Sequence, residues 1–379
     1  MRFLHLSDLH LGKRLGELSL LPDQEHILKE ILTIIDNEVP DAVLIAGDVY
    51  DKSTPSEEAV KLFGGFLSRL AERHLPVYII SGNHDSAVRL SFAADLIDSS
   101  GIHIAPVYDG SVKPFLLKKN GQMVNIYLLP YLKPVIVRNA LPDRAEEIHN
   151  HNEALRVALD NVDIDPSSCN ILLAHQFVTG ASRSESEEVS VGGMDNVDAS
   201  LFDAFDYVAL GHLHRPQSIG RETLRYCGTP LKYSFSESGD TKSVTLVDID
   251  MEKNISIRTV PLVPLHDMRE IKGTYSELTA KKNYENTAVD DYLHITLTDE
   301  EDIPDGVSKL RIIYPNLLKL TYDNERTRQG HNPEASADTE KKDPLNLFSE
   351  FFESVNGRPM SSRQTELVQR LIEEIWEEK

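Results

Sequence analysis

Five segments that could bind metal ions each follow directly after a short apolar run. They are Asp8-Leu9-His10, Gly47-Asp48, Gly82-Asn83-His84-Asp85, His175-Gln176 and Gly211-His212-Leu213-His214. Short apolar runs bounded by turn-forming residues are typical of buried strands. In α/β folds the carboxyl ends of the strands meet at one edge of the sheet, so the side chains that follow them can converge. The pattern therefore predicts an α/β domain with a metal centre at one sheet edge.

Six apolar runs in all alternate with amphipathic segments between residues 1 and 267. The runs cover residues 3–6, 42–45, 77–80, 126–129, 171–173 and 207–210. Apolar residues at helical spacing predict helices from Asp23 to about Pro40 and from Pro55 to about His74. We expect residues 1–267 to form one large α/β domain.

The composition changes after residue 267. Residues 268–323 contain charged loops and two strand-like pieces, at 292–297 and 309–314, which suit a small α+β unit. Residues 324–342 are polar and lack apolar periodicity, which predicts a linker.

The last segment, residues 343–379, carries apolar side chains at helical spacing. The pattern predicts two short helices, the second beginning with a capping box between Ser361 and Gln364. These helices have no obvious core of their own. They either dock on a partner protein or fold back on the main domain.

The net charge argues against a protein that coats nucleic acid through its overall field. Lys and Arg total 39 against 61 Asp and Glu, which gives a formal charge of −22. Any contact with DNA has to be local. Bound divalent cations would offset the negative charge at the point where a phosphate approaches.

The N-terminal residues and the cysteines indicate a reducing compartment. The chain opens with Met1-Arg2-Phe3-Leu4, without the apolar stretch of a secretory signal, and has no run of about 18 apolar residues. Its two cysteines, Cys169 and Cys227, are isolated in the sequence. We expect a cytoplasmic protein without disulfide bonds and without a membrane span.

The mixture of ligand types selects a class of metal. A single Asp or His after a strand is more often a cap, turn or surface residue, but five such clusters together favour a metal centre. Carboxylate and amide oxygens combined with imidazoles, without thiolate, indicate manganese, with magnesium, iron or zinc as alternatives. The ligands exceed one coordination sphere, so we expect two ions.

The whole set of motifs resembles the calcineurin-like metallophosphoesterase superfamily, whose pattern is D-x-H, G-D-x-x-D, G-N-H-D, a single His and G-H-x-H. Within that superfamily the chain resembles the SbcD family of DNA nucleases, as in Ala174-His175-Gln176 and Cys227-Gly228-Thr229-Pro230. The resemblance implies an α/β fold, a four-layer α/β/β/α sandwich. It further implies a DNA-capping domain at residues 268–323 and a helical segment at 343–379 that binds the SbcC ATPase.

The resemblance also implies roles for individual side chains. One metal would be held by Asp8, His10 and His214, the other by Asn83, His175 and His212, with Asp48 bridging the two. His84 would stabilise the transition state or protonate the leaving oxygen, with Asp85 orienting its ring. Asp85 could instead cap the helix that follows Ser86. Family members often carry a histidine at the position of Asp51, so the resemblance assigns it no role.

Four basic residues lie close in sequence to the ligand loops and are candidate phosphate contacts. They are Lys13, Arg14, Arg89 and Arg215. Charged residues near loops are mostly solvated, and this is the alternative for each of the four.

The function implied by the resemblance is that of a manganese-dependent DNA nuclease. It would be a 3'–5' exonuclease on double-stranded ends and an endonuclease on hairpins and single strands. A hydroxide shared by two metals would attack the phosphorus in line with the leaving oxygen. The partners implied are DNA and SbcC, with two copies of the chain in a heterotetramer that acts in DNA repair, recombination and replication. The chain lacks a G-x-x-x-x-G-K-[ST] loop, so any dependence on ATP would come from the partner.

Two other interpretations remain open. The substrate could be a phosphoprotein, a nucleotide or another small phosphoester. The chain could also be a non-catalytic scaffold that keeps the fold, although scaffolds tend to lose ligands and all five motifs are intact here.

Overall fold

The computed structural model describes most of the chain. The described residues are 1–92, 94–187, 195–330, 345, 348–349, 351–353, 358–365 and 367–369. They divide into two compact units. Unit 1 comprises Met1–Ile271, Thr287–His294 and Arg311–Lys319, and unit 2 comprises Lys272–Asn286, Ile295–Leu310 and Leu320–Lys379.

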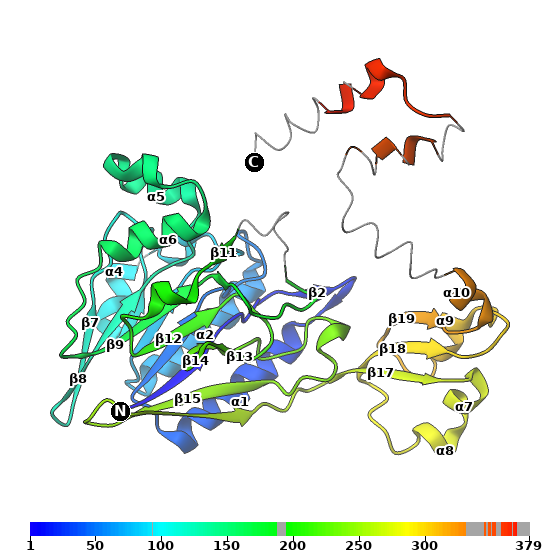
Figure 1. Ribbon diagram of the computed structural model, residues 1–379. Coiled ribbons are helices and arrows are strands. Elements are labelled where there is room, and N and C mark those ends of the chain that lie inside the picture. Colours follow the sequence, from blue (N-terminus) through cyan, green and yellow to red (C-terminus); the bar gives the residue numbers. More distant parts are fainter. Residues whose placement is uncertain are drawn as a thin grey trace. The chain divides into compact units, whose positions relative to one another are not determined.

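Unit 1 is built on two six-stranded sheets, which lie face to face in Figure 1. The first has the order β16 (Ile255–Pro261), β15 (Ser243–Ile249), β1 (Arg2–Leu6), β4 (Ala42–Ala46), β5 (Val77–Ile80), β6 (Ile102–Ile104). The second has the order β13 (Gln217–Ile219), β14 (Arg221–Tyr226), β12 (Tyr207–Gly211), β9 (Cys169–His175), β8 (Gln122–Leu128), β7 (Phe115–Lys119). The strands that precede the ligand motifs run parallel to one another within each sheet, so their carboxyl ends share one edge.

Three apolar clusters explain why these segments form layers. Side chains such as Leu44 of β4 and Leu173 of β9 pack between the two sheets. Alternate residues, such as Ile45, point to the opposite face and pack with helices α1 (Leu21–Glu38) and α2 (Glu57–Glu72). The outer face of the second sheet packs with α5 (Pro134–Ala140) and α6 (His151–Asp160). The predicted four-layer α/β/β/α sandwich is therefore confirmed.

The predicted strands and the two long helices of the sandwich all form, with ends that differ by a few residues. Shorter elements occupy the connections. They are β2 (Arg14–Leu15), β3 (Leu18–Ser19), α3 (Ala87–Leu90), α4 (Ala94–Ile97), β10 (Phe177–Val178), β11 (Asn196–Val197) and the 3₁₀ turns at Asp98–Ser100, Pro142–Glu147, Ala199–Phe202 and Phe235–Glu237.

A small three-stranded sheet follows the sandwich in sequence. Its order is β17 (Met268–Gly273), β18 (Tyr292–Leu297), β19 (Leu317–Tyr322), and the accompanying helices are α7 (Tyr275–Thr279), α8 (Lys281–Tyr284), α9 (Gly306–Leu310) and α10 (Glu325–Gly330). Thr274 begins α7 with a capping box to Glu277.

The predicted strand at residues 309–314 is wrong. Leu310 ends helix α9, and the third strand lies further on, at β19. Gly306, Leu310 and Tyr314 are buried whereas Ile312 is 84% exposed. Buried positions four residues apart are typical of a helical path rather than of a strand, where alternate residues share a face. The β-branched pair at 312–313 misled the prediction.

The end of the chain is described only in part. Residues 331–342 of the predicted linker lie outside the described residues, and the segment before them contains helix α10. Most of the predicted tail also lies outside them, but at its second predicted helix the Gln364 side chain accepts a hydrogen bond from the Ser361 backbone N–H at 3.0 Å. Among the described helices, none has the length and apolar character needed to cross a bilayer.

Candidate metal centre

The ligand-bearing loops emerge from the carboxyl ends of β1, β4, β5, β9 and β12, and those after β1, β4 and β12 contain residues in strained conformations. Asp8, His10, Asp48 and His212 all have positive φ, at 52°, 44°, 48° and 104°. Residues other than glycine seldom adopt this conformation, and it persists where surrounding structure enforces it, often at functional sites. Four of the seven predicted ligands are held in this way.

The two sheets approach each other closely at this edge. A methyl group on Gly211 at the end of β12 would overlap the carbonyl oxygen of Ala46 at the end of β4. One on Gly47 would overlap the ring of His175. Glycine at both positions lets the ligand loops of the two sheets meet.

The first predicted ligand group is Asp8, His10 and His214, whose ligand atoms all lie within 4.8 Å of one another. The Nε2 atoms of His10 and His214 are 3.1 Å apart. Asp8 is fixed in place by the backbone N–H of His212, which donates to its Oδ1 at 2.9 Å. All three side chains are buried.

The second group is centred on Asn83. Its Oδ1 lies 3.0 Å from Nε2 of His175 and 2.9 Å from Nδ1 of His212. Asp48 lies between the groups, with Oδ2 3.3 Å from Nε2 of His175 and 3.6 Å from Nε2 of His10. The structure thus brings all seven predicted ligands together around two adjacent positions.

Burial and crowding shift the pKa values of these groups strongly. Burial, together with the charge of Asp48, raises the pKa of Asp8 to about 6. Burial lowers the pKa of His212 to about 3. Burial also tends to lower the pKa of His175, but the negative charge of Asp48 has the larger effect and raises this pKa to about 9. For Asp48, burial is outweighed by the neighbouring imidazoles, which hold its pKa well below the usual range.

The donor set suits divalent cations by its chemistry and by the closeness of its ligand atoms. Two buried carboxylates, Asp8 and Asp48, lie with the His175 imidazole within 4.8 Å of one another, and despite burial the charge of Asp48 raises the pKa of that imidazole. Metal binding displaces protons from such groups, because ligands bind in their deprotonated form. Oxygen and imidazole donors, gathered without thiolate, fit manganese and similar ions.

His84 lies beside the centre with its ring half-buried. One of its ring nitrogens lies within 4.8 Å of ligand atoms of His10 and Asp48. Its Nδ1 is 3.0 Å from the backbone carbonyl of Asp51. Since a carbonyl can only accept, Nδ1 carries the proton of this bond and Nε2 is left for other partners.

Asp85 is placed differently from the expectation that it orients the His84 ring. Its carboxylate accepts hydrogen bonds from the backbone N–H groups of Val49 at 3.1 Å, Tyr50 at 2.9 Å and Gly82 at 2.9 Å. The carboxylate therefore ties the loop after β5 to the loop after β4. The orienting contact to the His84 ring comes from Asp51 instead.

The four predicted phosphate contacts differ in position. The ammonium of Lys13 lies 2.8 Å from Oδ1 of Asp51, next to His10. Arg14 bonds to the carbonyl of Glu17, Arg89 to the carbonyl of Ser53, and Arg215 to the carboxylate of Asp240. Lys13 is thus the one of these four that the structure places against the ligand loops.

Several residues around the centre were missed by the sequence reasoning. They are Ser186, Glu187, Glu237 and Lys242, which contact His214 or one another. Arg183 was also missed, and its guanidinium lies over the ring of Phe177, which in turn lies near His212. No spacing rule links these residues to the motifs, although the Ser-Glu cluster at 184–187 was a visible polar feature.

Comparison with solved structures finds partial likenesses. A dimetal phosphatase from Danio rerio aligns with 70% of this chain and 98% of its own, at 12% identity and a TM-score of 0.41. TT1561 of Thermus thermophilus aligns with 68% of this chain and 98% of its own, at 12% identity and a TM-score of 0.37.

Comparison with sequence families is more specific. Residues 1–216 match the calcineurin-like phosphoesterases, and residues 264–356 match the type 5 capsule protein repressor C-terminal domain. The SbcD subunit of the SbcCD nuclease of Staphylococcus epidermidis is 32% identical over 381 residues, which cover 98% of each chain. The chain therefore belongs to the SbcD family of calcineurin-like metallophosphoesterases and is a metal-dependent phosphodiesterase.

Proposed function

We propose that this chain is a manganese-dependent DNA nuclease, a 3'–5' exonuclease on double-stranded ends and an endonuclease on hairpins and single strands. The observation that carries this proposal is the gathering of seven oxygen and imidazole donors, including the Asp48 carboxylate between two groups of three. Two divalent cations bound there would supply a hydroxide nucleophile at neutral pH and neutralise the charge of the phosphate.

His84 acts on the leaving group in this proposal. Its Nδ1 donates to the Asp51 carbonyl, which fixes the ring and leaves Nε2 directed to other partners. In the protonated ring, Nε2–H can donate to a phosphate oxygen or transfer its proton to the leaving oxygen. Asp85 supports this indirectly, by holding the loop that carries His84 against the loop that carries Asp48.

The DNA contacts have to be local in a chain with a formal charge of −22. Lys13 is the best placed of the predicted contacts, because its ammonium lies beside the ligand loops with only 18% of the side chain exposed. We assign the small module at residues 268–323 to DNA capping, as the family resemblance suggests. We also propose that the chain acts in the cytoplasm.

The C-terminal segment, residues 343–379, is proposed to bind an SbcC-like ATPase. Among its described residues, Phe348 is 42% exposed, Phe351 64% and Leu367 46%. Large apolar side chains that remain exposed along one segment are typical of a docking element.

A second copy of the chain is proposed to bind at α3 and α4. Val88, Phe92 and Leu96 in this region are 68%, 82% and 78% exposed. Burial of such a patch against its own copy would give the twofold interface usual for homodimers. Sedimentation of Phe92→Glu tests this, since the introduced charge should leave a monomer if the patch forms the interface.

The test of the proposed function uses end-labelled blunt duplex and hairpin DNA, with and without manganese. We expect degradation from 3' ends, opening of the hairpin, and loss of both in Asp48→Ala. Bis-p-nitrophenyl phosphate and p-nitrophenyl phosphate serve as small diester and monoester substrates. Rapid hydrolysis of the small esters without DNA cleavage would contradict the nuclease assignment and favour a small phosphoester substrate.

A further inference from the structure

His214 is fixed at three atoms by residues outside the seven ligands. Its backbone N–H donates to Oε1 of Glu187 at 2.7 Å. Its carbonyl accepts from Nζ of Lys242 at 2.8 Å. Its ring Nδ1 lies 2.6 Å from Oγ of Ser186. The backbone and the ring of this ligand are therefore both held by side chains from elsewhere in the sequence.

The proton positions in this cluster follow from Glu237. This carboxylate is fully buried and lies 2.5 Å from Nζ of Lys242, whose ammonium compensates its charge. Oγ of Ser186 lies 2.5 Å from Oε1 of Glu237. An ionised carboxylate can only accept, so the single hydroxyl proton of Ser186 points to Glu237.

The Ser186 oxygen is then left as an acceptor. It can accept from Nδ1–H of His214, and also from the hydroxyl of Ser184 at 2.8 Å, because a hydroxyl oxygen has two lone pairs. A neutral imidazole that carries its proton on Nδ1 has a free lone pair on Nε2. That atom faces Nε2 of His10 at 3.1 Å, within the first ligand group.

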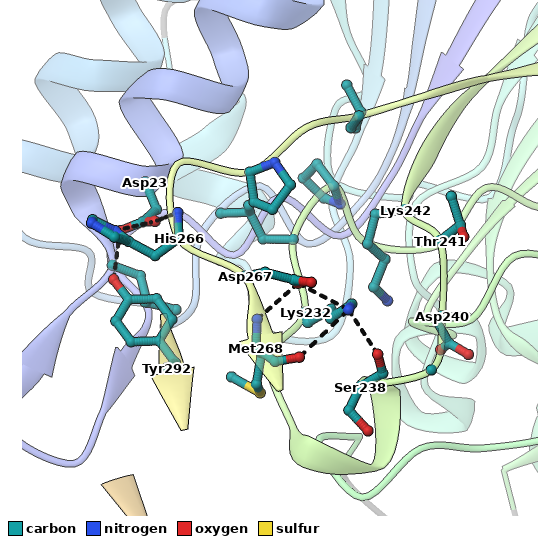
Figure 2. A pocket seen from close by; sticks show the side chains of 16 residues that line it. Asp23, Lys232, Ser238, Asp240, Thr241, Lys242, His266, Asp267, Met268 and Tyr292 are labelled. Carbon is teal, nitrogen blue, oxygen red and sulfur yellow. Dashed lines mark hydrogen bonds and ion pairs between the residues drawn. The ribbon is translucent and has the colours of Figure 1, made fainter. Parts of the chain in front are cut away.

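Lys242 is the last residue in this series of contacts. It is 5% exposed, and Figure 2 shows it among the side chains that line a cavity of about 330 Å³. The cavity's Lys232 is paired with Asp267 at 2.9 Å. Among the described residues, Glu237 is the carboxylate within ion-pair distance of Lys242. Glu237 and Lys242 therefore form a buried ion pair.

We propose that Ser186 and Glu237 are positioning residues that fix His214 as an Nε2 metal ligand, with Lys242 paired to Glu237. We call Ser186, Glu237 and Lys242 the His214 relay. The proposal rests on the metal assignment of the proposed function and extends it to residues outside the ligand motifs. Partners of this kind set the tautomer and orientation of a ligand histidine.

The relay should affect the metal affinity of the first ligand group and not that of the second. His175, in the second group, is fixed by a backbone contact instead, with Nδ1 donating to the Ala46 carbonyl at 2.8 Å. A side-chain substitution cannot remove that contact. Loss of the Ser186 hydroxyl should therefore weaken the first metal site selectively.

The test is a manganese titration of the full-length chain after metal removal, with bound metal counted by elemental analysis at each free concentration. We expect two ions in the unaltered chain. Ser186→Ala should bind one ion with unchanged affinity and the other about 10- to 100-fold more weakly. Ser186→Thr keeps the hydroxyl and should restore both.

A matched control lies on the same loop. Ser182 has a hydroxyl that bonds to Oε1 of Gln217 at 3.2 Å rather than to a ligand, so Ser182→Ala should keep both affinities. The ¹⁵N spectrum of the metal-free chain gives a second measurement, with His214 Nε2 expected as an unprotonated nitrogen that becomes partly protonated in Ser186→Ala.

Three outcomes overturn the relay. They are an unchanged titration in Ser186→Ala, an equal weakening of both sites, and a loss that Ser186→Thr does not restore. The titration measures bound manganese and the ¹⁵N spectrum measures the protonation of His214, and neither measures DNA cleavage. Their result is therefore independent of whether the substrate is DNA.

Discussion

Gly228→Ala should disrupt the first ligand group through the backbone of His214. Gly228 has φ of +80°, and a methyl group there would lie 2.6 Å from the carbonyl oxygen of His214 and 2.8 Å from Cδ of Pro216. Contacts of this kind are at least 3.0 Å in real proteins, so about 0.4 Å must be gained by moving backbone. The neighbour that has to move is His214, a proposed metal ligand.

The expected magnitude has two parts. An alanine with positive φ costs roughly 1–2 kcal/mol of stability. Misplacement of a catalytic group by about 1 Å can lower activity by about 100-fold, so a shift of a few tenths of an ångström should lower it roughly tenfold. Gly220→Ala separates the two parts, because Gly220 has φ of +68° and has nothing within 4 Å of the added methyl.

The assay is manganese-dependent hydrolysis of bis-p-nitrophenyl phosphate, measured beside urea denaturation. Gly220→Ala should lose stability and keep its activity. Gly228→Ala should lose stability and also activity, with weaker binding of one metal. Full activity in Gly228→Ala, at unchanged metal affinity, would refute the argument that the His214 backbone position matters.

Substitutions of His84, Asp8 and His5 test the site and the core. His84→Gln should keep both metals by elemental analysis and lose most turnover, and loss of metal would contradict its placement outside the ligand set. Burial raises the pKa of Asp8 to about 6, so the ionised carboxylate destabilises the metal-free fold at pH 8. Asp8→Asn should therefore be more stable than the unaltered chain in EDTA, by up to about 3 kcal/mol in urea denaturation, and an equal or lower stability would contradict this. Burial, with the charge of Arg225, lowers the pKa of His5 to about 3, whereas the unfolded chain takes up this proton near 6.5. Stability should fall as pH drops from about 6.5 towards 3, and urea denaturation across that range should show a shallower loss in His5→Gln; an equally steep loss would contradict the burial of a neutral His5.

The local apolar pattern was sufficient to predict an α/β domain and the strands that precede the ligand motifs, whereas the four-layer sandwich was predicted from the family resemblance. Each of the five strands that precede a ligand motif is largely an apolar run, and the motif follows it directly. Parallel pairing then brings motifs that are far apart in sequence to one edge. The same local pattern gave a wrong prediction at residues 309–314. Ile312 and Ile313 favour a strand, but Gly306, Leu310 and Tyr314 are the buried residues, and their spacing of four is helical.

The surroundings of the ligands could not be predicted, because they depend on contacts between distant segments. Glu237 reaches Ser186 across 51 residues, and neither residue stands in a ligand motif. Asp85 does stand in one, yet its carboxylate bonds to backbone amides of a loop more than 30 residues away. Backbone groups have no sequence signature, so partners of this kind become visible only in the folded chain.

An anomalous difference map of crystals grown with manganese tests the two-metal centre most directly. Two peaks are expected roughly 3.5 to 4 Å apart, one among Asp8, His10 and His214 and the other among Asn83, His175 and His212, with Asp48 in contact with both. A single peak, or manganese bound away from these side chains, would contradict the two-metal assignment.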